Sequence, residues 1–488
     1  YGIPYATAPT GKDRFKSPLP PPTWKNPLKA VNGSIICPQP VSVATENCLV
    51  ANVFVPRRSA KKLPVLVLTH GGGFEFGFGN MFTFKHLLET KQMIVVTYNY
   101  RLNALGFLCL GTEDVPGNAG LKDQLALFRW VKKNIAPFGG NADDVTAMGF
   151  SVGAASTGIF IISNAFKGLF NKVIMDSGAN IADFHIQHNP IKNAQEYAKL
   201  LNFTKVDNLK ELEEFYKTIS YAELVSKSCT GLFSPCVERD LGLEAIITKS
   251  PVSILKSGNY QKVPILQGFT EHEGLHLIGL FNSTKAMMNR NFSAFLPGDL
   301  SFKNDEEKQR VASNVKRFYF GDKEVNDETI LNFVIYLSDT LFIYPILRSI
   351  QFYLKAGQKN IYLYEYTFVD KDTPYIPHTN IRGVRHIAGT LAVADITNNG
   401  TLDESSITDD YKQMKHIMRT LWSNFIVNGT PVTNDTGLPN WPPVYKNWSP
   451  HMELNLPIKL KGIVILRRFR FWDRIYEKYY NDPIPPRE

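Results

Sequence analysis

Short apolar runs separated by amphipathic stretches dominate residues 63–180 of this 488-residue chain. Nearly continuous apolar runs predict strands buried on both faces, and they lie at 63–69, 93–98, 145–148 and 172–175. Between the second and third runs, residues 121–135 place apolar side chains at the spacing of a helix. Alternating strands and helices are typical of an α/β protein, so we expect a mostly parallel, doubly wound central sheet.

The rest of the chain adds fewer strands and more helices. We expect strands at 48–56, 264–268 and 361–366, and helices at 194–201, 209–219, 411–427 and 471–476. Residues 186–260 are expected to be mainly helical, and residues 276–350 mostly helical and polar, so both would cap the sheet as inserted regions. No repeat, low-complexity segment or flexible linker is recognisable, so we predict one domain over residues 1–488.

Composition and charge exclude several classes of function. Hydrophobic residues make up 44% and charged residues 20%, which is an ordinary globular composition. The net charge of +9 is spread along the chain without a nucleic-acid motif, so no nucleic-acid partner is expected. No uninterrupted run of 18 or more apolar residues occurs, so no integral membrane segment is expected.

Two features favour a secreted protein. The residues from Tyr1 onward already look like the middle of a structural element, so we expect a preceding N-terminal piece with a secretory signal. Eight Asn-x-Ser/Thr sequons occur, against roughly four expected from ordinary composition. The candidate glycosylation sites are Asn32, Asn202, Asn282, Asn291, Asn399, Asn428 and Asn434.

The chain has an odd number of cysteines, five. Cys37 and Cys48 are close enough in the chain to close a small loop, and a disulfide there would add about 2–3 kcal/mol of stability. Cys229 and Cys236 could pair with each other or stay separate thiols. Cys109 lies in an apolar run, where we expect a buried thiol.

The candidate chemistry begins at Gly149-Phe150-Ser151-Val152-Gly153. A short strand precedes this stretch and a helix start rich in small residues follows it, which is the layout of a nucleophile elbow. The turn is tight, and glycines two residues on either side remove the Cβ atoms that would clash. Ser151 is therefore the candidate nucleophile.

A serine hydroxyl needs a histidine to take its proton and an acid to orient that histidine. On such a fold the chain order is serine, acid, histidine. Either Glu271 or Glu273, which follow the strand at 264–268, could be the acid. Chain position favours His386 as the base, but spacing alone leaves His378 open. Two other histidines lie late in the chain. We expect His416 on the surface of a helix and His451 in a proline-rich loop.

Backbone N–H donors for a developing oxyanion are expected at two places. Gly71, Gly72 and Gly73 follow His70 directly after the strand at 63–69, upstream of the elbow. Glycines let backbone N–H groups approach a substrate oxygen closely, and the residue after the nucleophile supplies a further N–H group. That residue is Val152.

Three further stretches are similar to motifs of a known family. They are Gly2-Ile3-Pro4-Tyr5-Ala6, Glu46-Asn47-Cys48-Leu49 and Gly117-Asn118-Ala119-Gly120-Leu121-Lys122-Asp123-Gln124. With the elbow, they make the chain resemble the type-B carboxylesterase and cholinesterase family over nearly its whole length. It looks most like the insect branch, which includes juvenile hormone esterases and antennal, odorant-degrading esterases. The resemblance implies an α/β-hydrolase fold with helical cap insertions.

The resemblance also implies residue roles. It selects Glu273 over Glu271 as the acid and His386 as the base, with Ser151 as the nucleophile. It assigns the oxyanion donors to Gly72, Gly73 and Val152, and supports a Cys37–Cys48 disulfide. Ser177 matches a serine that contacts the catalytic residues without reacting itself. Phe233 and Cys236 match an acyl-pocket segment.

Two departures from the family pattern bear on the substrate. Phe150 and Val152 replace the usual Glu and Ala of the family elbow, so Phe150 is a candidate substrate-pocket residue. The segment between Cys37 and Cys48 has no tryptophan, where cholinesterases carry their choline-binding Trp, so a cationic choline ester is not expected.

These observations together predict a serine carboxylic-ester hydrolase for small apolar esters, acting through an acyl-enzyme. The chemistry needs no metal and no cofactor. The alternative is a catalytically silent or ester-sequestering relative that works as a binding or adhesion protein.

Overall fold

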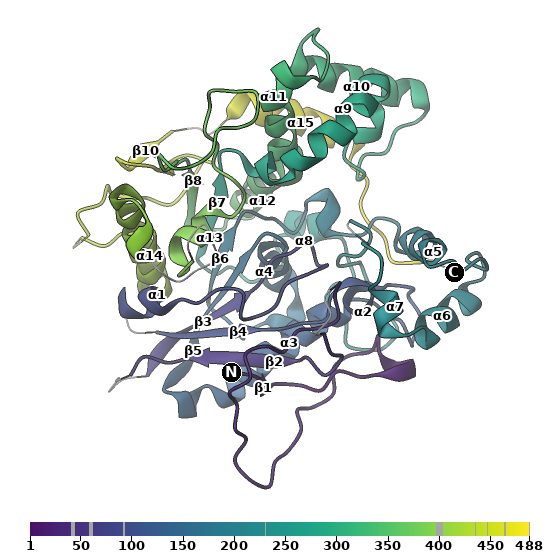
Figure 1. The fold of residues 1–488 in the computed structure, drawn as a ribbon, viewed down its shortest axis with the longest axis vertical. Helices are drawn as coiled ribbons and strands as arrows, with labels where there is room; N and C mark the ends of the chain where they lie inside the picture. Colours follow the sequence, from purple (N-terminus) through teal and green to yellow (C-terminus); the bar gives the residue numbers. More distant parts are fainter. Residues whose placement is uncertain are drawn as a thin grey trace.

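A computed structural model describes residues 1–40, 44–57, 62–90, 93–229, 231–396, 404–434, 436–446, 448–462 and 465–487. A ten-stranded sheet runs through the molecule in the order β1-β2-β4-β3-β5-β6-β7-β8-β9-β10 (Figure 1). The strands from β4 to β9 in this order are parallel. β1, β2 and β10 pair antiparallel at the two edges. The expected mostly parallel, doubly wound sheet is confirmed.

The strands β2 to β8 correspond to the strands predicted from the apolar runs. The short strands β1, β9 and β10 at the sheet edges were not predicted, because a few residues carry too little pattern. In chain order the strands are Ile3–Pro4 (β1), Val50–Phe54 (β2), Leu63–Thr69 (β3), Ile94–Tyr98 (β4), Gly140–Phe150 (β5), Lys172–Asp176 (β6), Ile265–Thr270 (β7), Ile361–Tyr366 (β8), His451–Leu454 (β9) and Lys459–Lys461 (β10).

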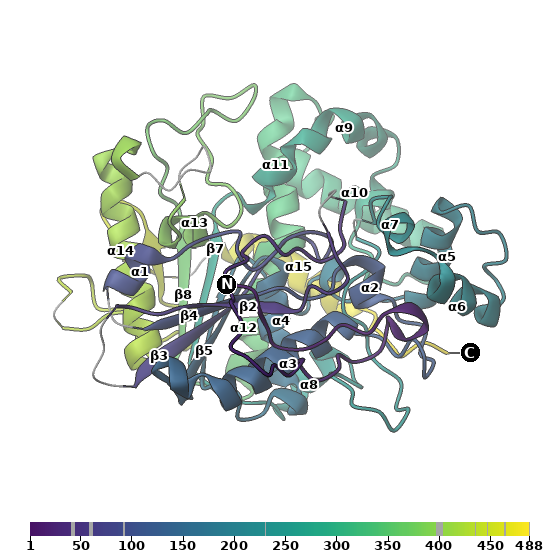
Figure 2. The same ribbon diagram turned by 60° about the horizontal axis from the view of Figure 1, so that its bottom comes forward.

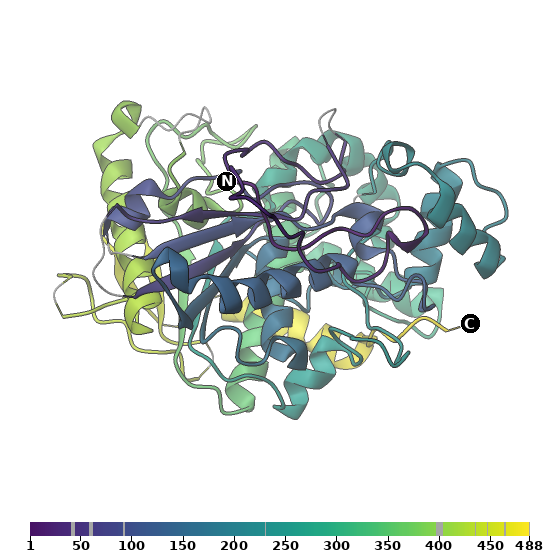
Figure 3. The same ribbon diagram turned by 90° about the horizontal axis from the view of Figure 1, so that it is seen from below.

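Helices cover both faces of the sheet, which explains why its central strands are mostly apolar. In β3, Val65 and Val67 belong to one buried cluster, and Leu66 and Leu68 to a second cluster on the other face. The first face packs against helices that include Ala119–Asn134 (α3), Val152–Ile162 (α4), Pro251–Ser257 (α8) and Tyr344–Lys355 (α12). The second packs against Lys85–Thr90 (α1), Ala388–Val393 (α13) and Asp409–Asn428 (α14) (Figures 1 and 3).

Two further groups of helices stand apart from the sheet (Figure 2). One contains Pro190–Leu200 (α5), Leu209–Thr218 (α6) and Tyr221–Leu224 (α7), near Asn103–Phe107 (α2). The other contains Phe281–Arg290 (α9), Asp305–Phe320 (α10), Ile330–Ser338 (α11) and the C-terminal Leu466–Tyr479 (α15). Short helical turns include Asp183–His185 (η4), Glu273–Leu280 (η5), Asp327–Thr329 (η7), Asp339–Ile343 (η8) and Glu404–Ser406 (η9).

The two predicted cap regions differ from expectation in detail. Residues 186–260 are helical only in part, because the described residues 225–229 and 231–250 contain no helix. Residues 276–350 are helical, but their second half is apolar rather than polar. The stretch Asp327–Lys355 reaches a hydropathy of 1.7 over its most apolar window, and 72% of that window is buried inside the molecule. By length and composition alone this stretch could cross a membrane, and its burial is typical of a core helix.

The disulfides confirm one expectation and correct another. Cys37 and Cys48 are bonded, as predicted. Cys109 is not a free thiol, because it is bonded to Cys236 across 127 residues of sequence. Cys229 therefore cannot pair with Cys236, and it is a free, buried cysteine. Sequence proximity favoured the wrong partner for Cys236, since only the folded chain brings Cys109 to it.

Candidate active site

Ser151 occupies a strained turn between β5 and α4. Its backbone angles are φ 56° and ψ −129°, a conformation that ordinary residues avoid. A Cβ atom on Gly149 would lie 2.0 Å from the carbonyl oxygen of Gly153, and one on Gly153 would lie 2.2 Å from that of Thr69. The N–H group of Ser151 donates to the carbonyl oxygen of Asp176 at 2.9 Å. The two glycines thus permit the turn that leaves Ser151 partly exposed.

Glu273 and His386 lie together although 113 residues separate them. Oε2 of Glu273 is 2.5 Å from Nδ1 of His386, and its Oε1 accepts a hydrogen bond from the N–H group of Thr270 at 2.8 Å. Glu273 is fully buried and His386 is 9% exposed. A charge-assisted hydrogen bond between two side chains that are shielded from water holds the imidazole ring in place. It leaves Nε2 as the ring nitrogen that can accept a proton.

The other candidates that the sequence left open lie elsewhere. Glu271 contacts His272, with 3.6 Å between the carboxylate and Nδ1. His378 lies 3.7 Å from Asp327. His416 is exposed on α14, and Nδ1 of His451 is bonded to the carbonyl oxygen of Gly462. None of these contacts leads to Ser151.

Asp176 connects the serine turn to the segment that carries His386. Its carboxylate accepts hydrogen bonds from the N–H and hydroxyl groups of Thr390 in α13, at 2.8 and 2.6 Å, and from Tyr364 at 2.8 Å. Burial raises the pKa of Asp176, and the charge of Glu273 raises it further. The adjacent Ser177 accepts a hydrogen bond from the N–H group of Ile387 at 3.3 Å. Asp176 and Ser177, at the end of β6, therefore hold the segment that follows His386 next to the turn at Ser151.

Nε2 of His386 is buried and has no hydrogen-bond partner among the described residues. A buried ring nitrogen without a partner is costly, and catalytic hydrogen bonds often tighten only when substrate is bound. This nitrogen is the atom that would exchange a proton with a serine hydroxyl and with an ester.

The glycine loop after β3 offers backbone donors. Gly72 and Gly73 have φ values of 108° and 66°, and a Cβ atom on Gly72 would lie 2.0 Å from the carbonyl oxygen of Phe76. No described residue accepts a hydrogen bond from the N–H groups of Gly72, Gly73 or Val152. The preceding His70 stacks on Tyr100 with 4.3 Å between ring centroids. This stacking supports the loop from the core.

The predicted pocket residues lie deeper than expected. Phe150 is 2% exposed, packs on Phe82 with ring centroids 5.5 Å apart, and would touch any side chain placed at Gly71. Val152 is fully buried. Phe233 packs edge-on against Tyr197, and Cys236 is closed in its disulfide, so its thiol is not available to a substrate. Phe150 thus contacts the glycine loop rather than an open pocket.

Two residues beside His386 were missed by the sequence analysis. His276 stacks on His386 with centroids 4.5 Å apart, and Phe342 lies 4.4 Å from the same ring. Nδ1 of His276 is 2.7 Å from the carbonyl oxygen of Glu273. Partial burial, and then the charge of His386, lower the pKa of His276 to about 4, although the residue keeps an exposed edge. The spacing of three residues between Glu273 and His276 was the available signal.

A cavity of about 910 Å³ opens beside His386. Its walls include residues on both sides of His386 in the chain and the stacked His276. Apolar side chains dominate the lining, among them Leu275, Ile278, Tyr366, Phe368, Ile376, Leu391 and Tyr411, with Arg385, Asp370 and Asp372 as charged members. Such a volume suits a drug-sized organic ligand.

Comparisons with known proteins agree with this geometry. A sequence model of the Carboxylesterase family matches residues 1–472. The chain is 32% identical over 476 residues to the juvenile hormone esterase of Heliothis virescens, covering 90% of this chain and 83% of that protein. It is 30% identical to esterase FE4 of Myzus persicae, covering 91% of this chain and 82% of that protein.

A solved structure is similar over almost the whole chain. It is the crystal structure of juvenile hormone esterase from Manduca sexta with OTFP covalently attached. The TM-score is 0.84 at 28% sequence identity, and the match covers 98% of this chain and 94% of that one. The fold, the match to the family model and these relatives agree with one another, so this chain belongs to the carboxylesterase family.

Proposed function

We propose that this carboxylesterase hydrolyses small apolar carboxylic esters with Ser151, Glu273 and His386 as its catalytic triad. The observation that carries the proposal is the 2.5 Å contact between Glu273 and His386. It leaves Nε2 of His386 buried and unpartnered among the described residues, so that this nitrogen is free to accept a proton. The residues present need no cofactor for this chemistry.

The reaction has two steps. Ser151 attacks the ester carbonyl while His386 takes the hydroxyl proton, and the N–H groups of Gly72, Gly73 and Val152 bind the oxyanion. The tetrahedral intermediate collapses, His386 gives its proton to the leaving alcohol, and the acyl group stays on Ser151. A water molecule then loses a proton to His386 and attacks the acyl-enzyme. The second tetrahedral intermediate collapses, His386 returns the proton to the oxygen of Ser151, and the acid is released. Each oxyanion donor is worth about 2.7–4 kcal/mol in such transition states.

The cavity beside His386 is the place for an apolar alcohol group. Because His386 protonates the leaving alcohol, that part of the ester must lie on the histidine side of Ser151. The cavity is lined by His276 and by Arg385 and Ala388, which flank His386 in the chain, and most of its other lining side chains are apolar. Burial of an apolar chain there contributes roughly 0.8 kcal/mol for each methylene group.

Replacement of Ser151 tests the triad. We expect Ser151→Ala to lower kcat on a simple aryl ester by about 10⁶-fold, as for other serine hydrolases that lose the nucleophile. Ser257→Ala, a matched change in α8, should leave the rate unchanged. An organophosphate should label Ser151 covalently in the unmodified protein, as seen by mass spectrometry of peptides. Full turnover by Ser151→Ala, or a label elsewhere, would exclude this triad.

A series of esters with lengthening alcohol chains tests the substrate class. We expect kcat/KM to rise with apolar chain length, and Ile278→Trp, which narrows the cavity, to remove that rise while sparing methyl esters. Leu280→Trp lies two residues further on, where the side chain is 50% exposed, and is the control. Juvenile hormone belongs in this series, because two relatives are named for it. Tight binding of esters with negligible turnover would instead identify a sequestering protein.

We also propose that the protein is secreted and glycosylated. Two disulfides support an oxidising compartment. The side chains of six predicted acceptors, Asn32, Asn202, Asn282, Asn291, Asn428 and Asn434, are exposed, whereas Asn399 lies outside the described residues. Enzymatic deglycosylation of protein from a eukaryotic host, followed by mass spectrometry, tests each position.

A further inference from the structure

Asp183, His188 and Asp299 converge at a place that the esterase chemistry does not use. Asp183 lies in η4, after β6, and His188 lies just before α5. Asp299 comes from the turn that precedes α10. One ligand atom of each residue lies within 4.8 Å of the others. Asp183 and His188 keep partial exposure, so the cluster has a path to solvent.

Two polar atoms in this cluster lack partners. The side chain of Asp299 is 1% exposed, and although its Oδ1 accepts a hydrogen bond from Tyr476 at 2.9 Å, its Oδ2 has no partner among the described residues. Nδ1 of His188 is buried and likewise without a partner there. A carboxylate oxygen and an imidazole nitrogen left unpaired in a dry place are costly unless something binds them.

No lysine or arginine of the described residues forms an ion pair with either carboxylate. Asp183 accepts a hydrogen bond from the N–H group of Gly298 at 2.7 Å. The guanidinium of Arg348 stacks on the rings of Tyr476 and Tyr480, at 4.6 and 4.3 Å. A bound cation would balance the charge of the two carboxylates.

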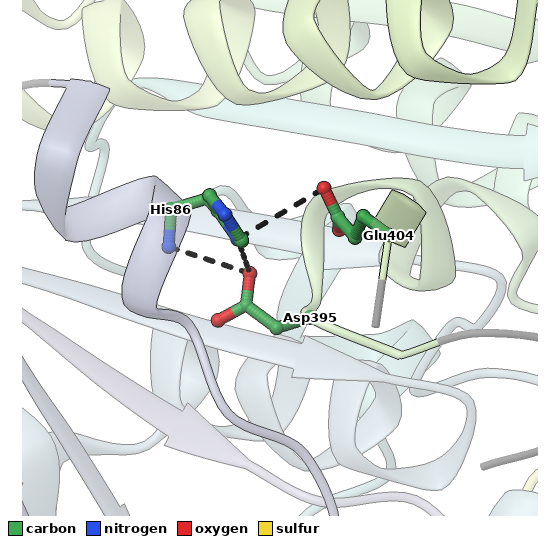
Figure 4. A group of neighbouring side chains, drawn as sticks. All are labelled: His86, Asp395 and Glu404. Carbon is green, nitrogen blue, oxygen red and sulfur yellow. Dashed lines mark hydrogen bonds and ion pairs between the residues drawn. The ribbon is translucent and has the colours of Figure 1, made fainter. Parts of the chain in front are cut away.

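A second cluster of similar composition consists of His86, Asp395 and Glu404 (Figure 4). It differs from the first cluster in how its charges are paired. His86 lies 2.8 Å from Asp395 and 3.9 Å from Glu404. There the carboxylates already have cations, because Arg419 contacts Asp395 at 3.2 Å and Glu404 at 2.5 Å. Lys415 adds a third contact, 3.2 Å from Glu404. The charges of this second cluster are balanced without a metal ion.

We propose that Asp183, His188 and Asp299 form a binding site for one divalent transition-metal ion, with Zn²⁺ as the best-suited ion. Zn²⁺ accepts an imidazole nitrogen and carboxylate oxygens at about 2.0–2.2 Å, with water completing its tetrahedron. The ligand atoms lie within 4.8 Å of one another and would move closer together around the ion. The ion would tie the segment after β6 to the turn before α10 and, through Tyr476, to α15. Its role is structural, since none of its ligands belongs to the triad.

Metal content and thermal stability of the whole protein test this site. The protein is treated with EDTA, dialysed and titrated with Zn²⁺, Ca²⁺ and Mg²⁺ separately. We expect one Zn²⁺ per chain by mass spectrometric metal analysis and a rise of about 2–3 °C in Tm at 100-fold excess over Kd. Ca²⁺ and Mg²⁺ should have a much smaller effect, because one ligand is an imidazole.

Matched variants locate the ion. His188→Gln and Asp299→Asn should both lose the bound Zn²⁺ and the rise in Tm, and circular dichroism verifies that each variant is folded. His86→Gln makes the same change in the balanced cluster and should retain both. No stoichiometric Zn²⁺ in the unmodified protein, retention by His188→Gln, or equal loss by His86→Gln would each overturn the proposal.

Discussion

Asp176 links the turn at Ser151, the proposed nucleophile, to the segment that carries His386, the proposed base. Its backbone oxygen holds Ser151, and its carboxylate holds Thr390 and Tyr364. We expect Asp176→Asn to lower the free energy of unfolding by about 2 kcal/mol, because an amide oxygen cannot replace a carboxylate that accepts several hydrogen bonds. Tyr364→Phe, which removes one of these bonds, should cost about 1 kcal/mol. Urea unfolding measures both, and an equal cost for the two variants would contradict this role.

Ile387 follows His386, the proposed catalytic base, and has the left-handed conformation, with φ 59° and ψ 17°. For a β-branched residue this backbone costs about 1–2 kcal/mol. In Ile387→Gly, relief of that strain should offset the loss of a half-buried side chain, so the free energy of unfolding should change by less than about 1 kcal/mol.

The control for this prediction is Ile254→Gly in α8, where Ile254 is also half-buried but helical. There the loss of packing and the poor helix propensity of glycine should add up to about 2 kcal/mol. Chemical unfolding of both variants gives the comparison. An equal loss at the two positions would show that the backbone at Ile387 is not strained.

At the level of elements, the two disulfides cross-link very different lengths of chain. Cys37–Cys48 closes a loop of 11 residues, and Cys109–Cys236 joins the end of α2 to the segment between α7 and α8, 127 residues apart. In the loop-entropy description, the longer loop contributes about 4–5 kcal/mol and the shorter about 2–3 kcal/mol. The variant Cys109→Ala/Cys236→Ala should therefore unfold at lower denaturant than Cys37→Ala/Cys48→Ala. The opposite order would assign the stabilisation to native contacts instead.

Some elements could be predicted from the pattern of apolar residues along the chain, and others could not. The strands β3 to β8 are apolar on both faces, so their composition identified them. The stretch 225–250 has no helix in its described part, since its conformation is set by contacts such as the Cys109–Cys236 bond. The apolar half of the second cap region differs from the prediction although its composition is visible in the sequence, because the polar residues of the first half dominated the expectation for the whole region.

For the whole molecule, buried neutral histidines predict how stability depends on pH. Burial lowers the pKa of His70 and of His185 from 6.5 to about 4, and both side chains are at most 1% exposed. The unfolded chain binds protons at these sites near pH 6.5, whereas the folded chain resists them until about pH 4. The stabilisation is therefore complete above about pH 6.5 and is lost as the pH falls towards 4.

Each of these histidines should contribute up to about 3 kcal/mol to this loss. We expect Tm to fall between pH 6.5 and 4, and His185→Asn to have a shallower dependence, because an amide can still donate to the carbonyl oxygen of Ala179 but does not titrate. Calorimetry over this pH range measures both proteins. Parallel curves for the two proteins would contradict the prediction.

The amino-acid sequence alone determined what depends on neighbours in the chain. The elbow around Ser151 follows from two glycines and a strand-to-helix change, and the glycine loop at 71–73 follows from its own residues. Only the tertiary structure decided the contacts between distant segments, because these depend on strand order. It brought Glu273 rather than Glu271 to His386, gave Cys109 rather than Cys229 to Cys236, and placed His276 against the base. Short-range sterics can be read along the chain, whereas long-range pairing requires the sheet that places β5, β6 and β7 side by side.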